Sequence, residues 1–150
     1  MVIERVRAVD DEVVASLNRL LPQLANGARE VTAEALGEVV GASGTALFVA
    51  RVDGGIVGTV TVVVYGIPSG AHAWFEDLVV DTSARGAGVG EALVRAALAE
   101  AEALGARTVD LTSSPPREAA IRLYHRVGFR RRETSVFRYF AAGGPASSGA

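Results

Sequence analysis

Residues 80–94, VDTSARGAGVGEALV, place three glycines at alternate positions directly before a run of helix-forming residues. Each glycine in a helix costs roughly 0.5–1 kcal/mol relative to alanine, so three of them at this point need a physical reason. A loop that turns directly into a helix presents unpaired backbone N–H groups at the positive end of the helix dipole. The stretch therefore predicts a site for a phosphate or pyrophosphate, and such a site needs no lysine.

The residues expected to form this anion site are Arg85, Gly86, Ala87, Gly88, Val89 and Gly90. The small residues let the backbone approach the anion, and the Arg85 guanidinium is placed to bind a phosphate oxygen. Two alternatives stay open here. The glycines could serve only close packing between a strand and a helix, or the loop could bind a dinucleotide. The dinucleotide pattern GxGxxG fits less well, because Glu91 occupies its sixth position, where glycine or alanine is required.

The elements around this loop predict the fold class. Residues 71–81 and 107–114 are predicted strands, and residues 88–104 form the helix between them. A strand, helix, strand unit requires a parallel pair with a right-handed crossover. The other predicted strands, residues 2–9, 46–52, 56–65 and one or two strands within 129–140, favour antiparallel pairing. We therefore predict a mixed α/β (α+β) fold with helices on both faces of the sheet, and not a doubly wound one.

Local signals fix several of the boundaries. Asp53, Gly54 and Gly55 predict a tight hairpin turn, because these residues accept a positive φ. Asp10 or Asp11 is the expected N-cap of a helix over residues 11–24. Thr32 opens a second helix that ends near residue 41, and residues 115–127 predict a short helix with proline at its start.

Length and composition limit the class of protein. The 150 residues, 49% of them hydrophobic, fit one domain over residues 1–140, and the last ten, AAGGPASSGA, predict a disordered tail. A net charge of −2 with both signs well mixed favours neither nucleic acid nor an anionic membrane as a partner. The sequence shows no signal-peptide pattern and no apolar run of about 18 residues, so we expect a cytoplasmic location.

Missing residue types exclude several kinds of chemistry. The chain has no cysteine and two histidines, so we expect no disulfide, no thiolate nucleophile and no metal. All fifteen basic residues are arginine, which excludes a lysine-dependent phosphate loop and a Schiff-base lysine. The chemistry that remains uses backbone amides, carboxylates and phenols.

Two motifs resemble those of the GNAT superfamily of N-acetyltransferases. Residues 85–90 match the family's (Arg/Gln)-x-x-Gly-x-(Gly/Ala) loop, and residues 120–129, AIRLYHRVGF, resemble its A-x-x-L-Y-x-x-x-G-F segment. The motifs are about thirty residues apart, as in the family, and the order of predicted elements over residues 2–140 is also similar. This resemblance implies a mostly antiparallel sheet of six to seven strands with a splayed parallel pair.

The resemblance also implies acetyl-coenzyme A as the acetyl donor. Its pyrophosphate would bind the backbone amides of residues 85–91, so Glu91 joins the predicted site. Its pantetheine arm carries two amides, which can bond to an exposed strand as an added strand would. In this chain the bonding segment would be Leu78, Val79 and Val80, whose side chains also suit a buried strand.

Acetyl transfer to an amine needs an acid and a base. A lysine-like amine has a pKa of roughly 10.4, so at neutral pH a base must remove its proton, and the departing thiolate gains from an acid. Tyr124 matches the family tyrosine that commonly acts as this acid, although it could also simply pack on Phe129. Glu76 is the predicted base, because many members carry a carboxylate near this position; its alternative role is a surface ion pair. Asp77 is expected on the opposite face of the strand.

The acceptor cannot be identified from sequence motifs. The resemblance implies that residues 18–40 and 65–74 hold it, and Glu30, Glu34 and Glu38 would suit a cationic amine. Arg117 stands where many relatives carry asparagine, and Ser113 or Ser114 could replace that contact. We expect direct acetyl transfer to a primary amine of a small molecule or peptide, with a homodimer left open. A non-catalytic acetyl-coenzyme A sensor and a binder of another diphosphate are the rival hypotheses.

Overall fold

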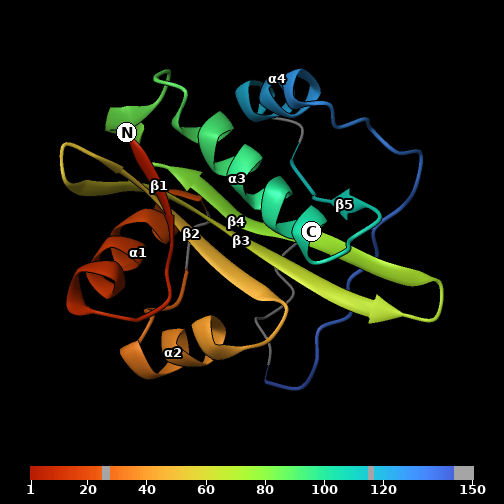
Figure 1. Cartoon of the computed structure of the whole chain (residues 1–150), viewed down its shortest axis with the longest axis horizontal. Helices are drawn as coiled ribbons and strands as arrows, with labels where there is room; N and C mark the ends of the chain where they lie inside the picture. Colours follow the sequence, from red (N-terminus) through yellow and green to blue (C-terminus); the bar gives the residue numbers. More distant parts are fainter. Residues whose placement is uncertain (25–27, 115–116, 144–150) are drawn as a thin grey trace.

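The computed structural model describes residues 1–24, 28–114 and 117–143 (Figure 1). Its elements follow in the order β1 (Val2–Arg5), α1 (Asp11–Leu24), α2 (Ala33–Gly41), β2 (Thr45–Val52), β3 (Gly55–Ile67), β4 (Gly70–Val80), the short 3-10 helix η1 (Thr82–Ala84), α3 (Val89–Ala103), β5 (Val109–Asp110) and α4 (Glu118–Val127). Two predictions fall partly outside the described residues: the prolines at 115–116 and the tail, of which residues 144–150 are not described. No helix in the described ranges is long and apolar enough to cross a membrane.

The described strands form one mixed sheet in the order β1-β2-β3-β4-β5. The first four strands pair antiparallel, and β4 pairs with β5 in parallel through Ala73 with Val109 and Trp74 with Asp110. Figure 1 shows α3 and α4 on one side of the sheet and α1 and α2 on the other. The predicted mixed fold, with helices on both faces and one parallel step, is confirmed.

The local signals that depend on turn and cap chemistry are also confirmed. Asp53 and Gly54 have φ values of 50° and 83° in the turn between β2 and β3. The Asp10 carboxylate accepts a hydrogen bond from the Val13 amide at 2.8 Å, which caps α1. The Thr32 hydroxyl accepts one from the Ala35 amide at 3.1 Å, which caps α2.

Two apolar clusters hold the helices on the sheet. Leu93, Val94 and Ala97 of α3 are fully buried in one cluster against the inner residues of β2, β3 and β4. Leu17 and Leu20 of α1 and Leu36 of α2 form the other cluster on the opposite face. The glycine loop therefore leads into a helix that is fixed along its length, and this fixes the direction in which its first amides point.

The sheet is smaller than predicted at both edges. β1 ends at residue 5 and β5 spans two residues, and residues 129–140 form no strand, so the described sheet has five strands and not six or seven. Strand pairing needs a neighbouring edge, and a β5 of two residues offers almost none. Residues 131–140 are exposed throughout, and Phe137 and Tyr139 are both 91% exposed.

Candidate active site

β4 contains a β-bulge near its middle. Thr59 pairs with Val79 and Thr61 pairs with Glu76, so β4 has one residue more than β3 in this interval. Within it lies Asp77, whose φ of 52° is positive, as in the first residue of a glycine-type bulge. A residue other than glycine in this conformation stores strain of order 1–3 kcal/mol, and such strain is most common at functional sites.

The bulge places two carboxylates on one face of the sheet. Glu76 pairs with Thr61, and directly paired residues of antiparallel strands share a face. Thr61 and Asp77 both line a cavity beneath α1 and α2. Phe75 packs in the cluster against α3, whereas Val79 packs in the cluster against α1. The expectation that Glu76 and Asp77 leave opposite faces is therefore wrong, because it assumed a regular strand.

Both carboxyl groups have a raised pKa although both residues are exposed at the surface. Desolvation raises the pKa of Glu76, the neighbouring Asp77 charge raises it further, and the Arg138 charge opposes these effects. Desolvation alone raises the pKa of Asp77. A raised pKa brings a carboxylate closer to the value that a general base needs near neutral pH.

The edge of β4 that faces β5 is open over its second half. Pairing with β5 ends at Trp74, and residues 75–80 pair only with β3 among the described strands. Leu78, Val79 and Val80, the predicted pantetheine segment, lie along this open edge. One acceptor there is already used, because the Arg85 guanidinium donates from Nε to the Val80 carbonyl at 3.1 Å. Arg85 therefore braces the loop in this structure.

The three glycines of the loop serve two different physical purposes. Gly86 and Gly88 have φ values of 81° and 79°, and a Cβ on either would meet no atom within 4 Å. These two positions need glycine for backbone conformation, and they leave the loop surface open. Gly90 needs it for packing, because its Cβ would lie 3.2 Å from Leu123 Cδ2 and 3.6 Å from Val80 Cγ2. The packing alternative thus applies to one glycine of three.

The amides of residues 85–91 are available to a ligand. Asp81 accepts a hydrogen bond from the Ser83 amide, and the first bond of α3 runs from the Ala92 amide to the Gly88 carbonyl. No hydrogen bond within the described ranges is donated by a backbone amide of residues 85–91. Successive free amides at a helix N-terminus form a binding site for a phosphate group.

Glu91 connects this loop to α4. Its carboxylate accepts hydrogen bonds from Arg126 Nε and Arg95 Nη2, both at 2.9 Å, and these bonds lower its pKa. The Arg126 guanidinium is therefore paired with Glu91 in this structure. The side chain of Glu91 thus links α3 to α4 through its ion pair with Arg126. Only the backbone amide of Glu91 remains a predicted cofactor contact.

Tyr124 of α4 is half-buried and packs against the apolar cluster beneath α3. Its ring packs edge-to-face on Phe129, with the ring centroids 5.8 Å apart, and Phe129 packs in the same way on Phe75 at 5.8 Å. Burial raises the pKa of the Tyr124 phenol, and the Arg117 charge partly opposes this. The phenol is therefore protonated at neutral pH, as a general acid must be.

Contacts from α1 support the loop before the glycines, and sequence motifs gave no sign of them. Arg19 forms an ion pair with Asp81, and its Nη2 donates to the Ile56 carbonyl at 2.6 Å. The Gln23 side-chain oxygen accepts a hydrogen bond from the Thr82 amide at 3.1 Å. These partners are about sixty residues apart, so no local sequence pattern links them. Arg117, likewise, donates to the Leu24 carbonyl.

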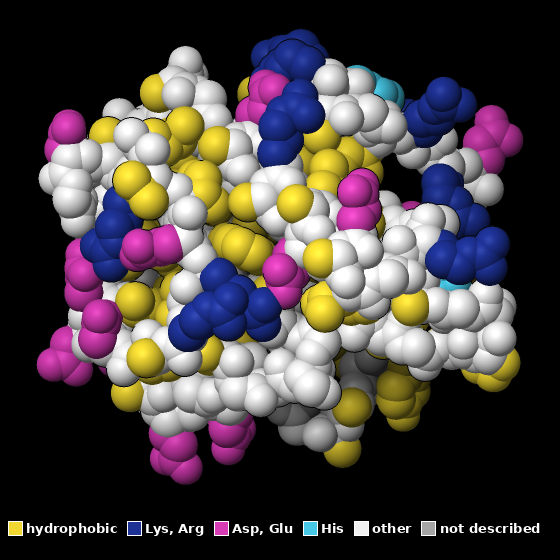
Figure 2. All heavy atoms as spheres, viewed as in Figure 1, with side chains coloured by type: hydrophobic (Ala, Val, Ile, Leu, Met, Phe, Trp, Pro, Cys, Tyr) yellow, Lys and Arg dark blue, Asp and Glu magenta, His cyan; other side chains and the backbone are white. Residues whose placement is uncertain are grey.

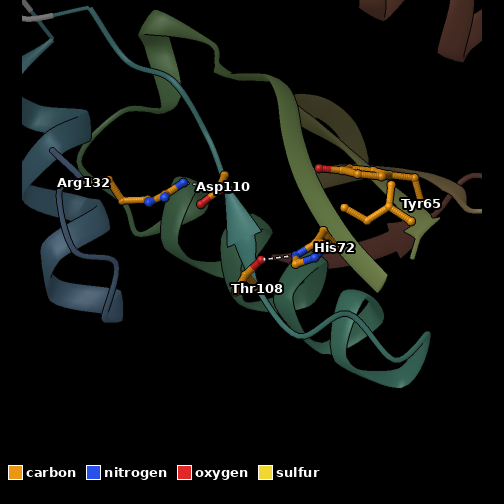
Figure 3. A pocket seen from close by; sticks show the side chains of 6 residues that line it. Tyr65, His72, Thr108, Asp110 and Arg132 are labelled. Carbon is orange, nitrogen blue, oxygen red and sulfur yellow. Dashed lines mark hydrogen bonds and ion pairs between the residues drawn. The ribbon is translucent and has the colours of Figure 1, made fainter. Parts of the chain in front are cut away.

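Two cavities border this region. The first, about 260 Å³, lies between α1, α2 and the sheet, and we call it the α1–α2 pocket; of Glu30, Glu34 and Glu38, only Glu30 lines it. The second, about 390 Å³, lies near the turn between β3 and β4. Figure 3 shows Tyr65 and His72 from that hairpin facing it beside Thr108 and Asp110, with His72 Nδ1 2.6 Å from Thr108 Oγ1. Each cavity is lined in part by a stretch expected to hold the acceptor, residues 18–40 for the first and residues 65–74 for the second.

Ser113 and Ser114 lie in the chain just after β5, before α4. The Ser113 hydroxyl oxygen is buried and has no hydrogen-bond partner within the described ranges. Ser114 is exposed, and its carbonyl accepts a bond from the Arg117 amide at 3.0 Å. Of the two serines considered as a replacement for asparagine, Ser113 is thus the one whose hydroxyl is buried without a partner in the described part of the chain.

Comparison with known proteins identifies the family. Residues 16–129 match the model of the acetyltransferase (GNAT) family, so the chain belongs to that family. It is an acyltransferase by family, as the two sequence motifs predicted. A comparison with curated proteins gives no match.

Solved structures agree on the fold. A Trypanosoma brucei acetyltransferase is 26% identical, with a TM-score of 0.72 over 93% of this chain and 100% of that chain. The glucosamine-6-phosphate N-acetyltransferase of Arabidopsis thaliana is 21% identical, with a TM-score of 0.76 over 94% and 100%. An aminoglycoside N-acetyltransferase, solved with a bisubstrate analogue of coenzyme A and acetylneamine, is 23% identical, with a TM-score of 0.77 over 93% and 97%.

Proposed function

We propose that this protein is an N-acetyltransferase that moves the acetyl group of acetyl-coenzyme A directly to a primary amine. The observation that supports this best is the open edge of β4, which leads directly into a loop of free amides at the start of α3. An extended, amide-bearing chain with a pyrophosphate at one end fits these two features together. The family match and the neighbour solved with a coenzyme A analogue support the same donor.

The direction of the bound donor follows from this arrangement. With its pyrophosphate on residues 85–91, the pantetheine arm runs back along β4 from Val80 toward Leu78. The thioester end then lies near Asp77 and Glu76, where the bulge places both carboxylates. Tyr124 lies on the α3 side of the sheet, where its ring packs on Phe129 and Phe129 packs in turn on Phe75 of β4. Base and acid therefore reach the reacting atoms from opposite faces.

In the proposed reaction Glu76 takes a proton from the acceptor ammonium, directly or through water. The freed nitrogen lone pair attacks the thioester carbonyl carbon, and a C–N bond forms. When the carbon–sulfur bond breaks, the Tyr124 phenol gives its proton to the departing thiolate, and the amide nitrogen loses its second proton to solvent. The products are an N-acetyl amine and free coenzyme A.

A thiol-release assay over a panel of amines tests this function. We expect thiol production that depends on both acetyl-coenzyme A and an amine, and the protein adds no thiol background because it has no cysteine. Melting shifts separate the rivals, since a ligand at 100 times its Kd adds roughly 2.7 kcal/mol of stability. Stabilisation by acetyl-coenzyme A without thiol release would favour the non-catalytic sensor, and stabilisation by ATP or NAD alone would favour another diphosphate.

The raised pKa of Glu76 predicts a pH dependence. Because a protonated carboxyl group cannot accept a proton, kcat/KM should fall as the pH falls through the pKa of Glu76 in the free enzyme. The Asp77 charge contributes to the raised value, so Asp77→Asn should lower this pKa and move the acid limb to lower pH. Profiles of kcat/KM against pH for both proteins measure the shift. An acid limb at the same pH in both would contradict the assignment of Glu76 as the base.

A further inference from the structure

The α1–α2 pocket is apolar over most of its wall. Leu17 and Leu21 come from α1, Leu36 and Val39 from α2, and Leu47 from β2. Thr59 is already satisfied, because its hydroxyl donates to the Phe48 carbonyl at 2.9 Å. This wall offers apolar contact and few free hydrogen-bond groups, so it does not suit a polyhydroxylated ligand.

Charged groups lie at a few points of the pocket. Arg29 and Glu30 are adjacent on the segment before α2, and their opposite charges balance. Asp77 on β4 is then the unbalanced charge, and Glu76 lies next to it on the same face. The net charge of the lining is negative, which favours a cation.

The wall of the pocket is held in place before any ligand binds. The Asn18 side chain of α1 donates from Nδ2 to the Val31 carbonyl at 2.9 Å and accepts from the Val31 amide at 2.7 Å. This pair of hydrogen bonds holds Val31, which lines the cavity just before α2, against α1. A preformed site loses less entropy on binding than one that must order itself.

The size of the pocket limits the ligand. Its volume of about 260 Å³ is below the roughly 300–1,000 Å³ that is usual for drug-sized ligands. A single ring or a short alkyl chain fits this volume, whereas a whole aminoglycoside does not. The ligand expected from volume, wall and charge together is a small apolar cation.

We infer that the α1–α2 pocket holds the apolar group of a small primary amine and that Asp77 binds the ammonium of this acceptor. The inference rests on the proposed function for the identity of the site as the acceptor site. It assigns Asp77 a binding role beside the catalytic role of Glu76. It also sets this chain apart from the sugar-amine enzymes whose fold it shares.

The first test uses two amines of matched reactive group. We expect 2-phenylethylamine to exceed glucosamine in kcat/KM by about tenfold or more. The ring of 2-phenylethylamine buries apolar surface, whereas the hydroxyl groups of glucosamine would lie against leucine side chains without hydrogen-bond partners. A preference for glucosamine overturns the inference and leaves the proposed function intact. If no amine of the panel is acetylated, the proposed function fails, and calorimetric binding of 2-phenylethylamine alone then decides the inference.

The second test compares matched variants in the same assays. Ala35 lines the pocket on α2, and Ala33 is an exposed residue of the same helix outside the lining. Ala35→Phe should fill the cavity and weaken 2-phenylethylamine binding about tenfold or more. Ala33→Phe should bind 2-phenylethylamine as the wild type does, and neither variant should change the Kd of acetyl-coenzyme A. Equal amine affinity in both variants overturns the pocket assignment.

Asp77→Asn tests the ammonium contact while keeping the fold, because asparagine tolerates a positive φ. Asp53→Asn is the matched control, since Asp53 has a φ of 50° in the turn between β2 and β3. Loss of a hydrogen bond to a charged group predicts about tenfold weaker binding of 2-phenylethylamine by Asp77→Asn, and no change for the uncharged 2-phenylethanol. Equal losses for both compounds, or no loss for the amine, would overturn the assignment of Asp77.

Discussion

Tyr124→Phe is expected to lower kcat by two or more orders of magnitude, because general acid catalysis contributes typically 10²–10⁴-fold. The substitution removes one hydroxyl group and keeps the ring, so the edge-to-face contact with Phe129 remains. The phenol acts only when the thiolate departs, and therefore the affinity for acetyl-coenzyme A should change little. Steady-state kinetics with a saturating amine give kcat, and calorimetry with acetyl-coenzyme A gives the Kd.

A matched control for this experiment is Tyr139→Phe. Tyr139 is 91% exposed on the segment after α4, so the loss of its hydroxyl should leave kcat unchanged. A Tyr124→Phe enzyme with wild-type turnover would remove Tyr124 from the reaction and leave it a packing residue on Phe129. A rise in KM for the amine at constant kcat would instead place the phenol in acceptor binding.

The parts of this structure that follow short-range rules were predictable. The turn at Asp53 and Gly54 and the caps at Asp10 and Thr32 each depend on a side chain and a backbone group within a few residues. The glycine loop belongs to the same class, because its free amides arise wherever a strand leads directly into a helix. For these features the local sequence contains nearly all of the relevant energy terms.

The bulge in β4 was not predicted, although its signal is present in the sequence. Regular alternation would put Phe75 and Val79 on one face, yet they pack on opposite faces. The two acidic residues between them, Glu76 and Asp77, interrupt an otherwise apolar strand and mark the change of phase. Adjacent polar residues in such a strand can be accommodated by a bulge without burying either carboxylate.

Long-range contacts explain the other features of the structure that the sequence did not predict. The ion pair of Arg19 with Asp81 and the bond from Gln23 to the Thr82 amide join α1 to the loop before α3. The alternation within residues 129–140 predicts a strand, but an added strand needs a partner edge, and β5 offers two residues. The basic side chains of residues 129–140 stay in solvent. Figure 2 shows several basic side chains on the side of the molecule where, in Figure 1, the chain continues after α4.

The double variant Gly86→Ala, Gly88→Ala should weaken acetyl-coenzyme A binding by about 30-fold or more. Alanine at a positive φ costs roughly 1–2 kcal/mol per residue, and a tenfold change in affinity corresponds to 1.4 kcal/mol. Neither new methyl group meets an atom within 4 Å, so the fold can relax by turning the loop out of its left-handed conformation. That turn redirects the amides on which the pyrophosphate is proposed to lie. Calorimetric titration with acetyl-coenzyme A measures the loss.

The control must separate backbone strain from lost binding, and two other glycines allow this. Gly54 and Gly105 have φ values of 83° and 84° and equally open surroundings, but they lie in the turn after β2 and after the end of α3. The double variant Gly54→Ala, Gly105→Ala should therefore lose a similar amount of stability in thermal unfolding and keep its affinity for acetyl-coenzyme A. Equal affinity losses in the two double variants would mean that strain alone weakens binding, and that the pyrophosphate lies elsewhere than on residues 85–91.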